Sequence, residues 1–340
     1  MTLRRLGFAS LMGSLLLLCV APPSAQAPKP TFKFVGPLRA PRNVAEFEKL
    51  FQQVSNWGRW GKEDELATLN LITDAKRVEA ASLVKLGISV SLAHEGNAIT
   101  EVAPDQQCPG CSGGPPRLSK GGDRIEWEIH GPGNSHLDIN CHMSHNGKSY
   151  NGFVTAEIRD EKNGCKKLGV DVFKNGIVTR GILIDMARFK GVPYLEPGTP
   201  VYSEDLDAWE KKTGVRVRSG DAVFLRDGRW VRRAKMGPWH PFTGLAGFHA
   251  SAVAWLRQRD VALVGSDSIS DVTPSGVEGV SFPVHRLIEA AMGAGLFDSM
   301  DLDALGETAA KLNRYEFMLT AHPLRLKGGT GSPLNPIATF

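Results

Sequence analysis

The segment HGPGNSHLDINCHMSHNG, residues 130–147, holds four of the nine histidines in the chain. If a strand runs through it, a period of two places His136, Asp138 and His142 on one face. Residues two apart along a strand lie about 6–7 Å apart, so His136 and Asp138 could bind one metal ion. His142, farther along, could then carry a proton. The alternative is a solvated strand face with no chemistry. His145 is interpreted as a bystander.

Further ligands must come from elsewhere, because a catalytic metal needs about three protein ligands and an open position for water. His285 precedes the helical pattern RLIEAAMGAGLF, and Asp298 is expected to end it. The ends of such a helix lie about 20 Å apart. Both side chains can therefore reach one site only if the helix is broken, and Gly293 and Gly295 are the expected break.

Four other residues are candidates for binding a substrate. His249 lies at a Gly-rich helix start, and Asp267 lies at the carboxyl end of a buried strand, where functional side chains of α/β sheets gather. The alternatives are packing or capping for His249 and loop capping for Asp267. Trp57 and Trp60 could stack on an aromatic substrate, or could simply anchor the N-terminal helix.

The elements that must position these residues follow from hydrophobic periodicity and from start and stop signals. Helices are expected over residues 44–54, 73–87, 203–214 and 247–260, and most of 283–312 reads as helical. Strands are expected over residues 88–95, 124–130, 176–187, 220–228, 261–268 and 315–326. Residues 101–123 favour a long surface loop or lid. Strands interspersed with helices argue for an α/β or α+β fold.

The N-terminus reads as an export signal over residues 1–27, with two arginines, a short apolar run and a small-residue site that ends at Ala27. Cleavage after about Ala27 would give a periplasmic or secreted protein, with no membrane contact afterwards. Residues 28–45 are expected to form an extended arm. In an oxidising compartment Cys108 and Cys111 could form a disulfide. Loss of the signal arginines would lower the formal charge of +4 to +2, which argues against a nucleic-acid partner.

Several segments together resemble the metal-dependent cyclase family, which includes bacterial kynurenine formamidase and isatin hydrolase. The family motif is His-x-Gly-Thr-His-x-Asp-x-Pro-x-His, and His136, Asp138 and His142 match it in GNSHLDINCHMSHNGKSYNG. The longer branch of the family is also matched by the following segments, in the family's order: SNWGRWGKEDELATLNLIT, GVRVRSGDAVFLRDGR, VALVGSDSISDVTPSG, FPVH and PLRLKGGTGSPLNPIATF.

The resemblance implies a fold and a site. The fold would be α/β of the swivelling β/β/α type, with a barrel-like mixed sheet flanked by helices, a single domain over 46–340 and a dimer or higher homo-oligomer. His136 and Asp138 would be ligands of a divalent metal ion, Zn or Mn, with His285 and Asp298 as distal ligands. His142 would be the general acid/base.

Two departures from the motif matter, and the first is that Asn140 stands in place of the motif's proline. The family's first histidine falls at Pro132, which cannot ligate. Either His130 reaches in past the Gly-Pro-Gly segment, or the site has one ligand fewer.

The main functional hypothesis is a metal-dependent hydrolase that cleaves a small-molecule amide, formamide or cyclic amide, a C–N bond other than a peptide bond. The alternative, motivated by Pro132, is an exported protein that binds a small molecule or a metal on the same scaffold without turnover.

Overall fold

The computed structural model describes residues 32–95, 117–119, 122–124 and 128–340. The expected signal peptide, the Cys108–Cys111 pair and most of the expected 101–123 loop lie outside these residues. Within them, no helix is both long enough and apolar enough to cross a membrane.

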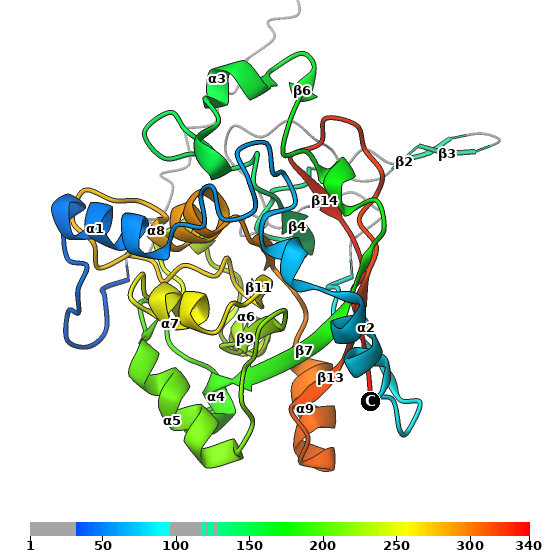
Figure 1. Ribbon diagram of the computed structural model, residues 1–340. Coiled ribbons are helices and arrows are strands. Elements are labelled where there is room, and N and C mark those ends of the chain that lie inside the picture. The colour runs from blue at the N-terminus through cyan, green and yellow to red at the C-terminus, as the bar shows by residue number, and fades with distance from the viewer. Residues whose placement is uncertain (1–31, 96–116, 120–121, 125–127) are drawn as a thin grey trace, which may run out of the picture.

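A mixed sheet of nine strands organises the described part of the chain and curls into a half-barrel (Figure 1). In spatial order the strands are β1 (Ser89–Ser91), β15 (Ile337–Thr339), β13 (Glu316–Ala321), β7 (Ile177–Asp185), β9 (Ala222–Arg226), β11 (Leu263–Ser266), β12 (Gly295–Asp298), β4 (His136–Asp138) and β14 (Gly331–Pro333). The central strands β7, β9, β11 and β12 are parallel, and the flanking pairs are antiparallel. The expected α/β fold with a barrel-like mixed sheet is confirmed.

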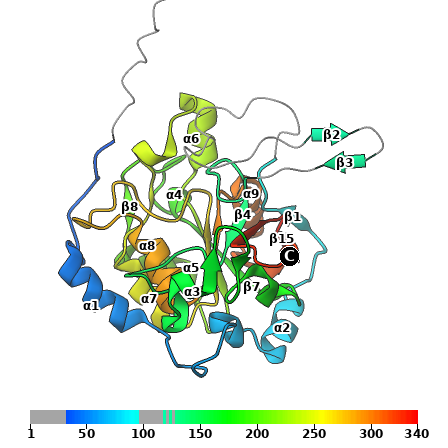
Figure 2. The ribbon, with the colours of Figure 1, turned by 90° about the horizontal axis from the view of Figure 1, so that it is seen from above.

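Helices and short two-stranded pairs surround the sheet. The helices are α1 (Val44–Val54), α2 (Asp74–Ala81), α3 (Thr155–Ile158), α4 (Met186–Phe189), α5 (Ser203–Thr213), α6 (Arg229–Met236), α7 (Ala252–Gln258), α8 (Pro283–His285), the π-helix η5 (Arg286–Met292) and α9 (Asp303–Leu312). The 3-10 turns are η1 (Ala67–Leu71), η2 (Tyr150–Gly152), η3 (Val170–Phe173) and η4 (Pro241–Thr243). The pairs are β2 (Arg117–Ser119) with β3 (Gly122–Arg124), β5 (Arg159–Asp160) with β6 (Gly164–Cys165), and β8 (Pro200–Val201) with β10 (Gly247–Phe248). The β2–β3 hairpin projects from the body (Figure 2).

Alternation along the central strands separates two hydrophobic cores. Val264 and Leu296 face a core shared with helices α1, α5, α7 and η5, whereas Leu263 and Phe297 face the concave interior with α9. In the antiparallel pair of β12 and β4, Leu296 opposes Asp138. Residues opposed across a pair share a face, so Asp138 faces the helix layer.

Several predicted elements are confirmed, and their caps show why they form. The Asn43 side chain accepts a hydrogen bond from the Glu46 backbone and caps the start of α1. The Thr73 hydroxyl accepts one from the Lys76 backbone and caps the start of α2. Gly214 ends α5 in the left-handed conformation. The predicted strands over 88–95, 176–187, 220–228, 261–268 and 315–326 contain β1, β7, β9, β11 and β13.

Three predicted elements need correction. The helical pattern over 283–312 is interrupted at Gly293, the expected break, which ends η5 at φ 74°, but the segment that follows it is the strand β12 and not more helix. A Cβ at Gly293 would lie 2.5 Å from the Tyr150 ring, so only glycine fits. The helix over 247–260 begins only at Ala252, because Gly247 and Phe248 pair with β8. The predicted strand over 124–130 does not extend to residue 130, because Ile129 and His130 lie in a turn.

One disulfide joins Cys141 to Cys165 within the described residues. It ties the turn after β4 to the β5–β6 hairpin, 24 residues along the chain. Cys141 directly precedes His142, so the bond restrains the backbone of that histidine.

Removing this bond tests its contribution. Cys165→Ser is expected to lower the free energy of unfolding by about 3 kcal/mol, because the unfolded chain regains the entropy of an open loop. Urea unfolding of the oxidised wild type and the variant measures the difference. Equal stabilities, together with a wild type that is insensitive to dithiothreitol, would contradict this account.

Candidate metal centre

The buried carboxylate of Asp138 lies at the centre of the candidate site. It is 1% exposed and ends β4 on the face toward the helix layer. Four histidines approach it: His130 Nδ1 at 2.6 Å, His136 Nε2 at 3.4 Å, and His142 Nε2 and His285 Nε2 at 3.9 Å each. Burial raises the pKa of Asp138, but the nearby His136, His142 and His130 together outweigh it and hold this pKa well below its usual value.

The register of β12 on β4 brings the next carboxylate into place. Asp298 opposes His136 across this pair. Ser270 donates to Asp298 Oδ1 at 2.9 Å, and His285 Nε2 lies 3.1 Å from Asp298 Oδ2. The break at Gly293 therefore brings His285 and Asp298 to one site, as expected, although Asp298 ends a strand and not a helix.

Hydrogen bonds at the far ring nitrogens orient two of the histidines. The Asn134 carbonyl accepts from His136 Nδ1 at 2.6 Å, and the Asp271 carboxylate lies 2.6 Å from His285 Nδ1. Both Nε2 atoms therefore face the cluster, and metal-binding histidines are typically oriented in this way by a hydrogen bond at the other ring nitrogen. Burial opposes charge on both rings, but the surrounding carboxylates raise the pKa of His136 and of His285.

His142 reaches the cluster through a turn and not along a strand. The strand ends at Asp138, and the His142 backbone donates to the Ile139 carbonyl at 2.7 Å. Arg159 donates to the carbonyls of Cys141 and His142, at 2.9 and 2.6 Å, and so fixes the turn. The predicted position of His142 farther along the same strand is therefore wrong, because the turn returns its ring toward Asp138.

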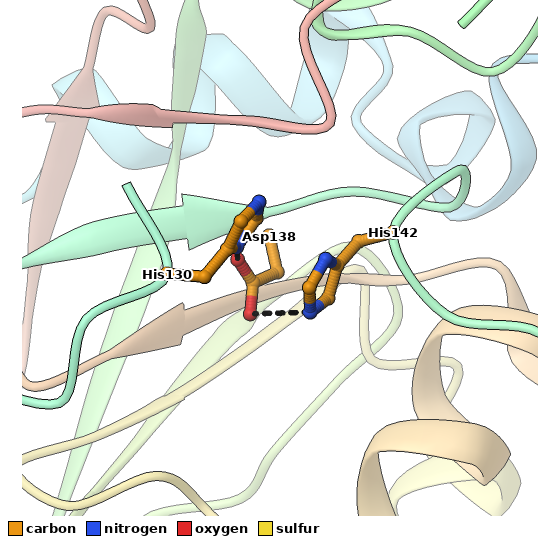
Figure 3. Close-up of side chains that lie close together, drawn as sticks. All are labelled: His130, Asp138 and His142. Carbon is orange, nitrogen blue, oxygen red and sulfur yellow. Dashed lines mark hydrogen bonds and ion pairs between the residues drawn. The ribbon is translucent and has the colours of Figure 1, made fainter. Parts of the chain in front are cut away.

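His130 and His142 form the exposed side of the cluster. Their rings stack with centroids 3.8 Å apart, and Figure 3 shows both beside Asp138. Their side chains are 24% and 25% exposed, against 8% for His285. Burial lowers the pKa of His142 to about 3 despite the nearby Asp138 carboxylate, so this ring is neutral at pH 7.

The loop at Pro132 explains how His130 enters. The Pro132 carbonyl accepts from Arg229 at 2.7 Å and from the Ser299 hydroxyl at 2.8 Å, which holds the loop against the end of β12. His130 Nε2 then lies 2.7 Å from the Thr330 hydroxyl. The geometry favours the alternative in which His130 joins the cluster.

These residues fit a divalent metal ion. Three groups of donor atoms, each within 4.8 Å of one another, share Asp138: they are His130 with His142, His136 with Asp298, and His285 with Glu289. Mixed imidazole and carboxylate donors suit zinc and manganese.

Comparison with known proteins assigns the chain to a family. The family model named Cyclase matches residues 77–271. The chain belongs to this cyclase family.

The chain is similar to a curated protein and to several solved structures. Isatin hydrolase of Roseibium aggregatum is 27% identical over 154 residues, which are 42% of this chain and 53% of that protein, so the match spans about half of the relative's length. A crystal structure described as a novel cyclase superposes with a TM-score of 0.71 at 29% identity, covering 85% of this chain and 99% of the other. Isatin hydrolase A of Ralstonia solanacearum shares the fold, with a TM-score of 0.50 at 20% identity, covering 78% and 97% of the two chains.

The predicted substrate-binding residues of the cyclase lie outside the cluster. Trp57 donates to the Ala290 carbonyl at 2.7 Å and packs on Phe51, which is the anchoring alternative. Trp60 stacks under the Arg59 guanidinium. None of these contacts involves a member of the cluster.

His249 and Asp267 also have structural environments. His249 is fully buried beside Tyr202, and burial lowers its pKa to about 4. The Asp267 carboxylate accepts from the backbone of Asp227 and of Gly228, both at 2.8 Å. This is the loop-capping alternative for Asp267.

Sequence reasoning missed two residues of the centre. Asp271 orients His285, and Glu289 lies four residues after His285, where helical spacing puts both on one face. The sequence contained a signal for each residue. Asp271 ends the segment SDSISD, four residues after Asp267, and Glu289 ends the segment HRLIE.

The capping pair of Asp227 and Asp267 gives a test of pH dependence. Burial raises the pKa of Asp227 to about 6 and that of Asp267 well above its usual value. A raised carboxyl pKa means that the folded state binds more protons than the unfolded state, so stability is lost as pH rises from about 4 to 6.

Asp227→Asn removes one ionisable group from this pair and keeps an acceptor for the Ser268 hydroxyl. The variant is expected to raise the melting temperature relative to wild type, and to raise it more at pH 8 than at pH 5. Thermal unfolding at both values measures this. An equal shift at the two pH values would show that the pair does not titrate as described.

Proposed function

We propose that this protein is a metal-dependent hydrolase that cleaves an amide, a formamide or a cyclic amide. The observation that carries the proposal is the convergence of four histidines and Asp298 on Asp138, reached from β4, its flanking turns, β12 and α8. The likeness to an isatin hydrolase, whose name indicates action on a cyclic amide, supports this substrate class.

His136, Asp138, His285 and Asp298 would hold the ion, with His130 at the position that Pro132 leaves open. When bound, a divalent ion lowers the pKa of its water to about 7 and polarises a carbonyl oxygen. Asp138 and Asp298 provide the negative charge that balances such an ion.

His142 would move the proton. Its ring lies on the exposed side of the cluster with Nε2 3.9 Å from Asp138, where it would accept a proton from water and return it to the leaving nitrogen. The Arg159 contacts and the disulfide at Cys141 hold the backbone on either side of this ring. The stacked His130 ring limits the ways in which His142 can turn.

We also propose that the protein acts after export, in the periplasm or outside the cell. The Cys141–Cys165 disulfide supports an oxidising compartment.

Replacing the proton carrier separates catalysis from metal binding. His142→Ala is expected to retain the metal and to lose about 10²- to 10⁴-fold in kcat, the usual contribution of a general acid/base. The assay uses aryl formamides, isatin and other lactams, with metal content measured alongside. The exposed His322→Ala serves as the matched histidine control. A metal-loaded wild type that hydrolyses no amide, lactam or lactone would overturn the hydrolase and leave a binding protein.

Replacing the central carboxylate tests the metal centre itself. Asp138→Ala is expected to abolish metal binding, because all three donor groups share this residue. Elemental analysis of the purified variant is the measurement. Retention of stoichiometric metal would refute the assignment of Asp138.

A further inference from the structure

The side chain of Glu289 is fully buried, and only one of its two carboxylate oxygens accepts a hydrogen bond. Its Oε2 atom accepts from the Met143 backbone at 3.1 Å. Its Oε1 atom has no hydrogen-bond partner and no contact with solvent. No Lys or Arg forms an ion pair with Glu289 among the described residues. A buried carboxylate oxygen without a partner costs free energy, so something absent from the protein chain should meet it.

The backbone directs Glu289 into the cluster. Glu289 follows His285 by four residues, and both belong to the continuous helical segment of α8 and η5. Asp271 holds the helix start by accepting from the backbone of Val284 and of His285. Donor atoms of Glu289, His285 and Asp138 all lie within 4.8 Å of one another. A π-helical segment of this kind often marks a functional site.

Charge at this place also favours a cation. Asp138, Asp298 and Glu289 are three buried carboxyl groups gathered around imidazoles, and burial together with the Asp138 charge raises the pKa of Glu289, so Glu289 loses its proton readily only beside a cation. Such a group is stable when a metal ion or paired cations neutralise it.

We propose that Glu289 is a ligand of the metal centre, sharing an ion with Asp138 and His285. The inference rests on the proposed function, because it requires that the cluster binds a divalent ion. The ion would be Mn²⁺ or Zn²⁺, which accept mixed oxygen and nitrogen donors.

The test compares Mn²⁺ and Zn²⁺ binding to the apo forms of wild type, Glu289→Gln and Glu289→Asp by titration calorimetry and elemental analysis. Glu289→Gln keeps the shape and the acceptor for Met143 but removes the charge. It is expected to weaken binding at least about tenfold. Glu289→Asp, which keeps a carboxylate, should restore part of the affinity. In Co²⁺-substituted protein the visible d–d spectrum should differ between wild type and Glu289→Gln.

Glu210→Gln is the matched control, since Glu210 is a buried carboxylate that pairs with Arg259 outside the cluster. It should leave metal affinity unchanged. If wild type binds metal and Glu289→Gln binds it equally, with an unchanged Co²⁺ spectrum, Glu289 is not a ligand and the proposed hydrolase still stands. If wild type itself binds neither ion, both the inference and the proposed function are overturned.

Discussion

The buried Asp138 carboxylate is the constraint on which this structure depends. A carboxylate that is 1% exposed needs compensation, and all of its ion-pair partners among the described residues are histidines. A protonated imidazole can balance the charge of the Asp138 carboxylate. The same imidazole can lose its proton near neutral pH and bind a metal ion, which then balances that charge. Lysine or arginine would stabilise Asp138 permanently and would occupy the same space. The choice of histidine makes the site one that can hold a metal ion.

The rest of the fold brings these partners to one carboxylate. The antiparallel register of β12 on β4 sets Asp298 beside His136. Gly293 ends η5 and reverses the chain, so that Asp298 at the end of β12 lies next to His285. Gly331 allows β14 to approach β4, since a Cβ there would lie 3.0 Å from the His130 ring and 2.6 Å from the Leu137 carbonyl. Close packing around His130 therefore depends on a residue that contributes no side chain.

Local sequence pattern was sufficient to predict many helices and strands, and it identified the site residues of the segment 130–147. Periodicity and caps predicted α1 and α5, and alternation correctly placed Leu137 and Ile139 opposite His136 and Asp138. The spacing of the histidine segment identified the side chains that converge. These features depend on neighbours in the chain, which the sequence displays directly.

Features that depend on distant contacts were harder to predict. The apolar run GLF before Asp298 suits a helix or a buried strand equally, and only pairing with β4 and β11 decides for the strand. His142 reaches Asp138 because a turn is fixed by Arg159 and by a disulfide to Cys165, partners that spacing cannot reveal. The positions of Asp271 and Glu289 could not be predicted either, because both residues contact a cluster that the fold assembles from four separate segments of the chain.

The most direct test of the central role of Asp138 is X-ray diffraction from crystals grown with Mn²⁺ or Zn²⁺, with anomalous scattering used to locate the ion. The account predicts an anomalous peak bound by Asp138 together with His136, His285 and Asp298, at ligand distances of about 2.0–2.2 Å. A fully occupied peak elsewhere, with Asp138 outside its coordination shell, would contradict it.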